Sequence, residues 1–249
     1  MKNLIENLTQ LSVLGIVGMK QSFEDEGVLL DDVITVKRIT ELCNLQSYVK
    51  IGGCEAKTDL YNCVKLGING VIAPMVETPF ALSKFINIVN DYPNKIDPYI
   101  VIESKTAYEN INDILESSKG KLKGIVVGRS DFSKSYNLNK SEVDSDFIYN
   151  KVEDILFNAK THNLTTTMGG NVSIKSTEFI KKMYYKKLLD KIETRNVVIK
   201  LTDQNISIIN EVIQKSLEFE INWLKYKLET SSYLSNEYSS RIELLSNRK

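Results

Sequence analysis

The sequence predicts an α/β protein folded as a TIM (β/α)8 barrel with a C-terminal helical extension. Short apolar runs, many of them rich in β-branched residues, alternate with amphipathic segments along residues 1–205. Most runs lead into a polar or glycine-containing turn, as is typical of buried parallel strands. Strand and helix alternating at this spacing indicate an all-parallel α/β fold. We expect strands at 13–19, 48–51, 70–73, 99–102, 124–127 and 164–168, and less clearly within 188–201.

Amphipathic stretches between these runs predict the connecting helices. The stretch 33–43 carries its apolar residues on one helical face. The stretch 107–115 does the same, with Thr106 as the expected N-cap. Pro79 fits the first turn of a helix that continues to 88, because a proline there loses no intrahelical hydrogen bond.

Polar residues gather directly after the predicted strands. In a barrel or in a doubly wound open sheet, the carboxyl ends of the strands form the ligand-binding edge. No G-x-G-x-x-G follows the first strand and no P-loop occurs, which removes the common nucleotide-binding open sheets. We therefore favour the barrel, with one strand that is hard to place. The polar residues at this edge are Lys20, Lys50, Glu77, Glu103 and Asp131.

The chain changes character near residue 205, which predicts a barrel domain at 1–205 and a helical extension at 206–249. Apolar residues follow helical spacing from Ile209 to Leu228, and a polar break precedes a second helix from Leu234. Two interpretations remain open for this tail. It could cover the outside of the barrel, or it could form an oligomer contact exchanged between subunits.

Composition excludes several classes of protein. Lys plus Arg and Asp plus Glu both number 32, so the basic excess of a nucleic-acid-binding protein is missing. No apolar run has the length of a membrane helix, and the first twenty residues do not resemble a signal peptide. A single His rules out a multi-His zinc site. Three Cys without a C-x-x-C fit reduced thiols, and we expect a cytoplasmic protein.

Two acidic residues end neighbouring strands, Glu103 in IVIESK and Asp131 in VVGRSD. Side chains from adjacent parallel strands converge at the C-terminal face of a barrel. Hard oxygen ligands of this kind suit Mg²⁺ or Mn²⁺, which keep positions open for water and a chelating substrate. The alternative is that each carboxylate only caps the helix that follows it.

The blocks VIESKTAYENINDIL and GIVVGRSDFS together resemble the metal-binding core of the HpcH/HpaI aldolase and citrate lyase beta-subunit family. GINGVIAPMVETPFAL, upstream, is similar to another strand of that family. The resemblance implies a barrel that holds a divalent metal through Glu103 and Asp131. It further implies a small 2-oxo acid or citrate-like substrate, such as pyruvate or oxaloacetate, and carbon–carbon cleavage that leaves a metal-stabilised enolate.

The same resemblance implies a substrate-binding segment and a nearby acid. The backbone N–H groups of Gly128, Arg129 and Ser130 would hold the substrate carboxylate. The Arg129 guanidinium could also grip a carboxylate directly. Glu77 matches a family position near the pocket, where it could hydrogen-bond Lys50 or cap the Pro79 helix.

Two departures from the family pattern concern the chemistry itself. Lys50 stands where family aldolases carry an arginine. A lysine supplies positive charge for an enolate, but it lacks the planar guanidinium that can donate two parallel hydrogen bonds. Alternatively, Lys50 could form a Schiff base. The family carries a His after an early strand, and this His is missing here. Glu24 or Glu26 could serve as the acid–base group in its place. The alternative is that these residues only form a solvated acidic loop. His162 precedes a strand, so we place it at the opposite face in a structural role.

These observations predict a divalent-metal-dependent carbon–carbon lyase or aldolase. Two other functions stay open: an impaired barrel that serves as a binding or scaffold subunit, and a related phosphoenolpyruvate/pyruvate condensing enzyme. We expect a homo-oligomer, a trimer or hexamer, with neither nucleic acid nor membrane as partner. Whether Glu193 and Arg195 reach the site, and whether an acyl-CoA or phosphate group takes part, is left open.

Overall fold

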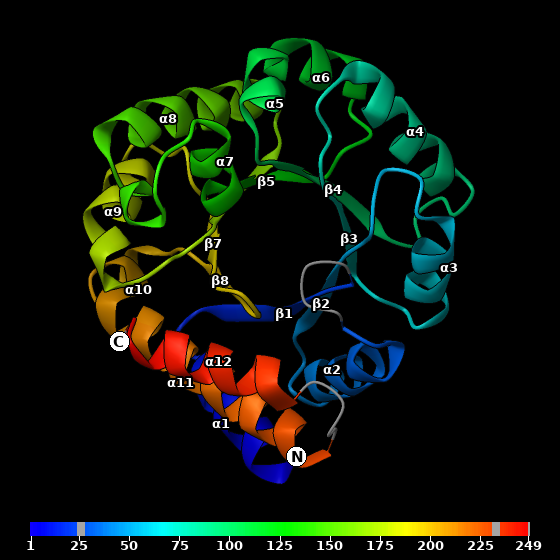
Figure 1. Cartoon of the computed structure of the whole chain (residues 1–249). Helices are drawn as coiled ribbons and strands as arrows, with labels where there is room; N and C mark the ends of the chain where they lie inside the picture. Colours follow the sequence, from blue (N-terminus) through cyan, green and yellow to red (C-terminus); the bar gives the residue numbers. More distant parts are fainter. Residues whose placement is uncertain (24–27, 231–234, 249) are drawn as a thin grey trace.

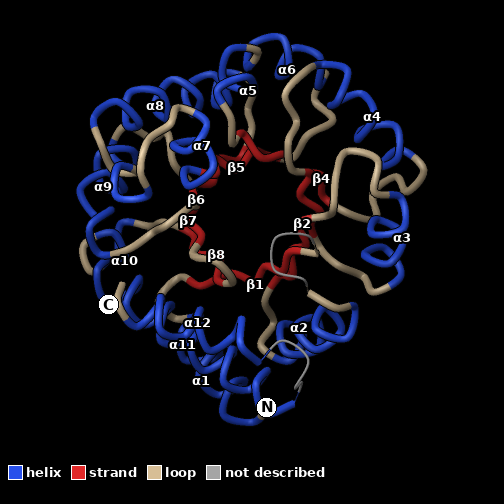
Figure 2. The backbone as a smooth tube through the Cα atoms, in the orientation of Figure 1, coloured by secondary structure: helices blue, strands red, loops and turns tan. Residues whose placement is uncertain are grey.

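In the computed structural model, which describes residues 1–23, 28–230 and 235–248, eight strands form a closed barrel in chain order. Figure 1 shows the helices arranged around this ring, and Figure 2 shows the strands as its inner wall. The predicted fold class, an α/β barrel with a helical C-terminal part, is confirmed. The strands are β1 Ile16–Ser22, β2 Gln46–Lys50, β3 Gly70–Ala73, β4 Asp97–Ile102, β5 Gly124–Gly128, β6 Thr165–Gly169, β7 Lys191–Glu193 and β8 Val197–Lys200.

The first predicted strand is displaced along the chain. Apolar character begins at Val13, but Val13 is 87% exposed in a turn and β1 starts at Ile16. Gly15, with a φ of 97°, makes the bend that separates α1 (Lys2–Ser12) from β1. Hydropathy marked the region correctly, whereas the glycine sets where the strand begins.

The eighth strand corrects the prediction of an all-parallel sheet. Strands β1 to β7 pair in parallel, but β8 runs antiparallel to both β7 and β1. A turn of three residues, Thr194–Asn196, joins β7 to β8, and a parallel strand would need a crossover of about a dozen residues. The apolar stretch 188–201 is therefore a hairpin that closes the barrel.

The helices fill the connections between strands and cover the barrel. Pro79 begins α4, as predicted, with Thr78 as its N-cap. The predicted helix at 107–115 is two helices, and its N-cap is Ser104 rather than Thr106, because the Ser104 hydroxyl accepts the Ala107 N–H. The remaining elements are α2 Leu30–Leu42, α3 Lys57–Lys65, α4 Pro79–Asn90, α5 Lys105–Glu109, α6 Ile111–Ser118, α7 Arg129–Ser135, η1 Lys140–Glu142, α8 Asp146–Thr161, η2 Ile174–Ser176, α9 Thr177–Tyr185 and α10 Asp203–Ile206.

The core has an outer and an inner part. The larger cluster of buried apolar residues lies between the strands and the surrounding helices. A smaller cluster fills the inside of the barrel, where the rings of Tyr48 and Tyr99 meet edge to face. These side chains fill the barrel interior, so it is a packed core and not a channel. A pocket at the carboxyl ends of the strands is therefore closed below by the barrel core.

The C-terminal helices α11 (Ile209–Thr230) and α12 (Ser235–Ser246) pack against the rest of the chain beside α1, as Figure 1 shows in orange and red. Trp223 of α11 is buried and stacks on Tyr226. Lys227 bridges to Asp32 of α2 at 3.1 Å, which ties the tail to the barrel. Within one chain, the tail thus covers the barrel; the oligomer interpretation stays a prediction.

No described helix is both long and apolar enough to cross a lipid bilayer. Cys43, Cys54 and Cys63 are free thiols.

Candidate functional site

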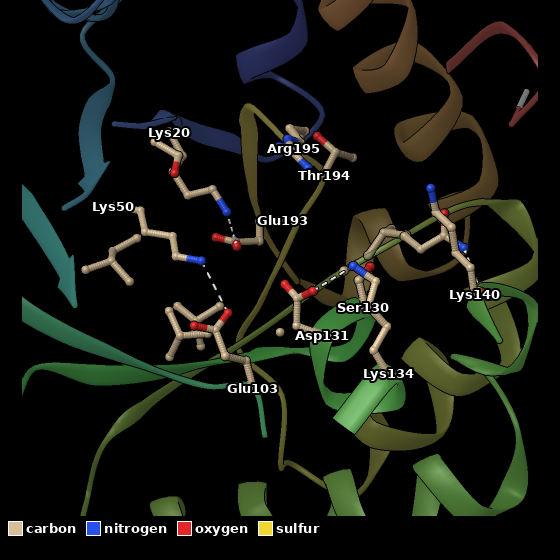
Figure 3. Close-up of a pocket in the computed structure, with 18 of the residues that line it drawn as sticks. Lys20, Lys50, Glu103, Ser130, Asp131, Lys134, Lys140, Glu193, Thr194 and Arg195 are labelled. Carbon is tan, nitrogen blue, oxygen red and sulfur yellow. Dashed lines mark hydrogen bonds and ion pairs between the residues drawn. The ribbon is translucent and has the colours of Figure 1, made fainter. Parts of the chain in front are cut away.

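A cavity of about 210 Å³ opens at the carboxyl ends of the parallel strands. Figure 3 shows charged side chains from several strand ends and loops pointing into it. Four of the five polar residues that the sequence placed at this edge line the cavity: Lys20, Lys50, Glu103 and Asp131. Glu193, Thr194 and Arg195 line it as well, because the antiparallel hairpin turns there. This resolves the question that the sequence left open for Glu193 and Arg195.

Glu103 directly follows β4 and is only 5% exposed. One carboxylate oxygen accepts the backbone N–H of Met75 at 3.0 Å, and the other lies 3.2 Å from Lys50 Nζ. Gly128, at the end of the adjacent β5, makes room for this carboxylate: a Cβ there would stand 3.3 Å from Glu103 Oε2. The glycine, the amide and the lysine hold the acid at the cavity wall.

A second acid–lysine pair faces the same cavity. Glu193, the last residue of β7, forms an ion pair with Lys20 of β1, and both side chains are largely buried. Glu193 lies over Gly169 at the end of β6, where a Cβ would stand 2.8 Å from Glu193 Cγ. Each acid therefore rests on the glycine that ends a neighbouring strand, and each has its own lysine.

Asp131 occupies the first turn of α7, where a carboxylate interacts favourably with the helix dipole. It bridges to Lys134 at 2.9 Å, and about half of its side chain is exposed. Among the described residues, no three His, Cys, Asp or Glu side chains converge as a complete metal site. Glu103 and Asp131 nevertheless fit Mg²⁺, which is commonly bound by one or two carboxylates with water and substrate supplying the other ligands.

Arg129 corrects one expectation. Its guanidinium is fully buried, forms an ion pair with Asp144, and donates to the carbonyl oxygens of Gly169 and Gly170 at 3.2 Å. The guanidinium also lies over the Phe179 ring, in a cation–π contact with Cζ 5.0 Å from the ring centroid. The guanidinium is therefore engaged by protein partners and does not line the cavity, unlike the side chain expected to grip a substrate carboxylate.

Three further predictions concern Glu77, the acids Glu24 and Glu26, and His162. Glu77 does neither of the two things expected of its side chain: it accepts the Ser104 hydroxyl, while Thr78 caps the Pro79 helix. Glu24 and Glu26 lie outside the described residues. His162 is the C-cap of α8 (Asp146–Thr161), with Nδ1 2.9 Å from the Asn158 carbonyl oxygen, and it does not line the cavity, in agreement with its predicted place.

Sequence reasoning missed three basic residues of the cavity: Lys134, Lys140 and Arg248. Lys134 lies one helical turn after Asp131, so its place was open to prediction. Lys140 begins η1 and Arg248 follows α12, and no local pattern marks either one. Among the described lining residues, six basic and three acidic side chains leave the cavity with three net positive charges.

An active site at the carboxyl ends of the barrel strands is characteristic of TIM-barrel enzymes, and the charged cavity defines a candidate of this class. The family model of the HpcH/HpaI aldolase/citrate lyase proteins matches residues 31–177, more than half of the chain. The chain belongs to this family, which makes it an enzyme of the carbon–carbon lyase type and confirms the resemblance found in the sequence. No functionally curated protein matches the sequence.

Solved structures share the fold at low sequence identity. The citrate synthase SbnG is 15% identical over 90% of this chain and 91% of its own, with a TM-score of 0.62. An HpcH/HpaI aldolase/citrate lyase family protein from Burkholderia cenocepacia J2315 is 12% identical over 86% and 90%, with a TM-score of 0.62. CitE from Mycobacterium tuberculosis, in complex with magnesium and acetoacetate, is 14% identical over 84% and 85%, with a TM-score of 0.54.

Proposed function

We propose that this protein is a divalent-metal-dependent lyase or aldolase that cleaves, or in reverse forms, a carbon–carbon bond next to a small 2-oxo acid or a citrate-like acid. The observation that carries the proposal is the joint presence of Glu103, Asp131 and Lys50 in one positively charged cavity. Two hard oxygen donors beside a cation suit an anionic substrate that presents oxygen atoms of its own.

Glu103 and Asp131 are the residues that would hold Mg²⁺ or Mn²⁺. Bound there, the ion supplies a Lewis acid that polarises the substrate carbonyl and offsets developing negative charge. Gly128 supports this assignment, because its missing side chain leaves space on the side of Glu103 Oε2. Family membership and the magnesium-bound CitE structure are consistent with the same choice of ion.

The backbone of Gly128, Arg129 and Ser130 is proposed to bind the substrate carboxylate. Gly128 is the N-cap of α7, and Arg129 and Ser130 are its first two residues; the first N–H groups of a helix have no intrahelical acceptor. Ser130 and Gly128 both line the cavity. Arg129 contributes through its backbone, and its buried guanidinium keeps the segment in place. We assign Glu77 to support of the same wall through Ser104 rather than to substrate contact.

Lys50 is proposed to stabilise the enolate. When a 4-hydroxy-2-oxo acid is cleaved, a base takes the hydroxyl proton as the C3–C4 bond breaks. An aldehyde leaves, and the electron pair of the bond stays on the 2-oxo product as an enolate, which then takes up a proton at C3. The base is Glu24 or Glu26 in this proposal, and Glu193 is a further carboxylate available in the cavity.

The decisive experiment measures oxalate binding by calorimetry with and without Mg²⁺. We expect the wild type to bind oxalate only with the metal, and Glu103→Gln and Asp131→Asn to lose this binding by roughly 100-fold or more. Glu211→Gln is the matched control, because Glu211 is a half-exposed acid paired with Lys215 on α11. A wild type that binds neither metal nor oxalate would refute the proposal.

Turnover separates the enzyme from an impaired barrel that only binds its ligand. Conversion of oxaloacetate to pyruvate, with the same sensitivity to the two substitutions, supports a working lyase. Metal-dependent oxalate binding without turnover of any 2-oxo acid tested favours a binding or scaffold subunit. Borohydride trapping of pyruvate on Lys50 would replace the electrostatic role with a Schiff base.

The oligomeric state and the cellular location are also proposals. We propose a homotrimer or homohexamer in the cytoplasm, which light scattering and cell fractionation would test.

A further inference from the structure

Three helices beside the cavity are joined by one lysine that lies among aromatic rings. The Nζ of Lys151, on α8, lies 4.3 Å from the ring centroid of Tyr108, which belongs to α5. It lies 5.0 Å from the centroid of Tyr136, the C-cap of α7, and 4.9 Å from that of Phe147 on α8. A cation over one aromatic face gains about 0.5–2 kcal/mol. One ammonium beside three rings therefore forms a clamp, the Lys151 clamp, between α5, α7 and α8.

Two of these helices carry the residues proposed to hold the metal. Glu103 directly precedes Ser104, the N-cap of α5, and Asp131 lies in the first turn of α7. Figure 1 shows α5, α7 and α8 as neighbours, in green, on one side of the barrel. Because each carboxylate stands at the start of its helix, the separation of the two depends on how α5 and α7 are placed against each other.

Aromatic packing connects the clamp to Asp131. Phe132 follows Asp131 and is fully buried. Its ring meets Tyr108 of α5 and Tyr136 edge to face, with centroids 6.2 Å and 5.4 Å away. Such pairs contribute about 0.5–1.5 kcal/mol beyond the burial of their area. A shift of α5 against α7 would therefore displace Phe132, and with it the acid that precedes it.

Hydrogen bonds join the same helices at two further points. The Lys105 N–H, at the start of α5, donates to Ser135 Oγ at the end of α7 at 2.8 Å. The Tyr108 hydroxyl donates to Asp154 of α8 at 3.0 Å. Helices α5 and α7 have only five and seven residues, too few to be stable alone, whereas α8 has 16 and a buried apolar face. The long helix is thus the support on which the two short ones are held.

We propose that Lys151 is a positioning residue of the metal site: its ammonium fixes α5 against α7 and so sets the separation of the Glu103 and Asp131 carboxylates. The inference rests on the proposed function, because it concerns the ion that these two acids would hold. Lys151 does not line the cavity. It acts through Tyr108 on the side of Glu103 and through Phe132 on the side of Asp131.

The sign of the effect separates positioning from simple electrostatics. The charge of a lysine repels a nearby cation, so removal of that charge alone raises the affinity for Mg²⁺ or leaves it unchanged. Loss of the clamp instead lets the two short helices shift, which spoils the arrangement of the two oxygen donors. Changes behind the direct ligands weaken metal binding by about 10–100-fold. Weaker Mg²⁺ binding after the loss of a positive charge therefore indicates positioning.

The test is a calorimetric Mg²⁺ titration of the wild type, Lys151→Met and Lys151→Arg. Methionine keeps an unbranched apolar chain without the charge, whereas arginine keeps a cation that stacks on aromatic faces. We expect Lys151→Met to weaken Mg²⁺ binding roughly tenfold, and Lys151→Arg to stay within about threefold of the wild type. Lys65→Met is the matched control and should change the affinity by less than about twofold. Lys65 is an exposed lysine of α3 whose Nζ lies 5.4 Å from the centroid of one ring, that of Tyr61.

A second variant removes one ring of the clamp and keeps the lysine. Tyr136→Leu should weaken Mg²⁺ binding in the same direction as Lys151→Met, by roughly threefold. Circular dichroism confirms that each variant is folded, and urea denaturation gives its free energy of unfolding. A contact that only stabilises the fold would lower this free energy and leave the Mg²⁺ affinity of the folded protein unchanged.

Two results would overturn the inference and leave the proposed lyase standing. One is an Mg²⁺ affinity of Lys151→Met equal to or above that of the wild type. The other is equal weakening in Lys151→Met and Lys151→Arg, which would assign the effect to the loss of the lysine chain rather than to its cation. A wild type that binds no Mg²⁺ would refute the proposed metal site, and the positioning role with it.

Discussion

Two lysine–glutamate pairs line the cavity, and they are alike in chemistry but different in setting. Lys50 and Glu103 come from β2 and the end of β4, within the parallel part of the barrel. Lys20 and Glu193 come from β1 and β7, next to the antiparallel strand that closes it. Each acid rests on a strand-end glycine, Gly128 for the first and Gly169 for the second.

The difference lies in what surrounds each acid. Glu103 also accepts a backbone N–H from Met75, a residue with a φ of 53°, and shares the cavity with Asp131. Glu193 sits at a hairpin whose turn is anchored to buried Glu220 of α11. The same kind of ion pair therefore lies beside a proposed metal ligand in one place and beside the hairpin that closes the barrel in the other.

Neutralising each acid in turn gives the largest expected difference between the two pairs. Glu103→Gln should reduce turnover by on the order of 10³-fold and abolish Mg²⁺ binding, because a charged oxygen donor is lost. Glu193→Gln should leave Mg²⁺ affinity within about threefold of the wild type, whatever it does to turnover. Calorimetric Mg²⁺ titration of both variants checks this. Loss of metal binding in Glu193→Gln would assign that acid to the metal instead.

Substituting the two glycines tests how tightly each acid is packed. A Cβ at Gly169 would stand 2.8 Å from Glu193 Cγ, whereas a Cβ at Gly128 would meet nothing closer than 3.1 Å. Gly169→Ala should therefore lower the free energy of unfolding by about 1–3 kcal/mol. Gly128→Ala should cost less than about 1 kcal/mol, since part of the strain is offset by the stiffer unfolded chain. Urea denaturation gives both values, and the reverse order would contradict the packing described.

The smallest effect concerns the lysines. Lys50 Nζ lies 3.2 Å from a Glu103 oxygen and competes with a cation for it. Lys50→Met should raise Mg²⁺ affinity by roughly tenfold while lowering turnover, because the competing charge is removed and enolate stabilisation with it. Lys20→Met is the matched control and should leave Mg²⁺ affinity within about twofold. Equal gains in both variants would show that the two pairs are electrostatically equivalent.

The parallel part of the barrel was predictable from local patterns. β3 spans 70–73 as predicted, and β5 differs by one residue, because β-branched runs flanked by polar turns favour buried strands. Glu103 and Asp131 could be placed at one face for the same reason: every parallel strand ends at the same edge. Their position in the cavity followed directly from the sequence, although a metal role for them is still a proposal.

Other features had no local signal. The stretch 188–201 reads as one apolar region, and the turn Thr194–Asn196 contains no glycine to announce a hairpin. Arg129 and Asp131 stand two residues apart on a helix, so they point in different directions, and which one faces the cavity depends on how α7 docks. Lys140 and Arg248 are far apart in sequence and meet through packing alone.

The distribution of charge shows the same difference between what local sequence predicts and what tertiary contacts decide. The chain has 32 basic and 32 acidic residues, and this balance argues against a surface built for nucleic acid. The cavity nevertheless carries a net positive charge, since folding brings basic side chains from separate segments to one place. Strand ends and their acids are local properties of the chain, encoded by apolar periodicity. The direction of β8, the burial of Arg129 and the convergence of basic residues at the cavity depend on contacts between distant segments, which no short pattern contains.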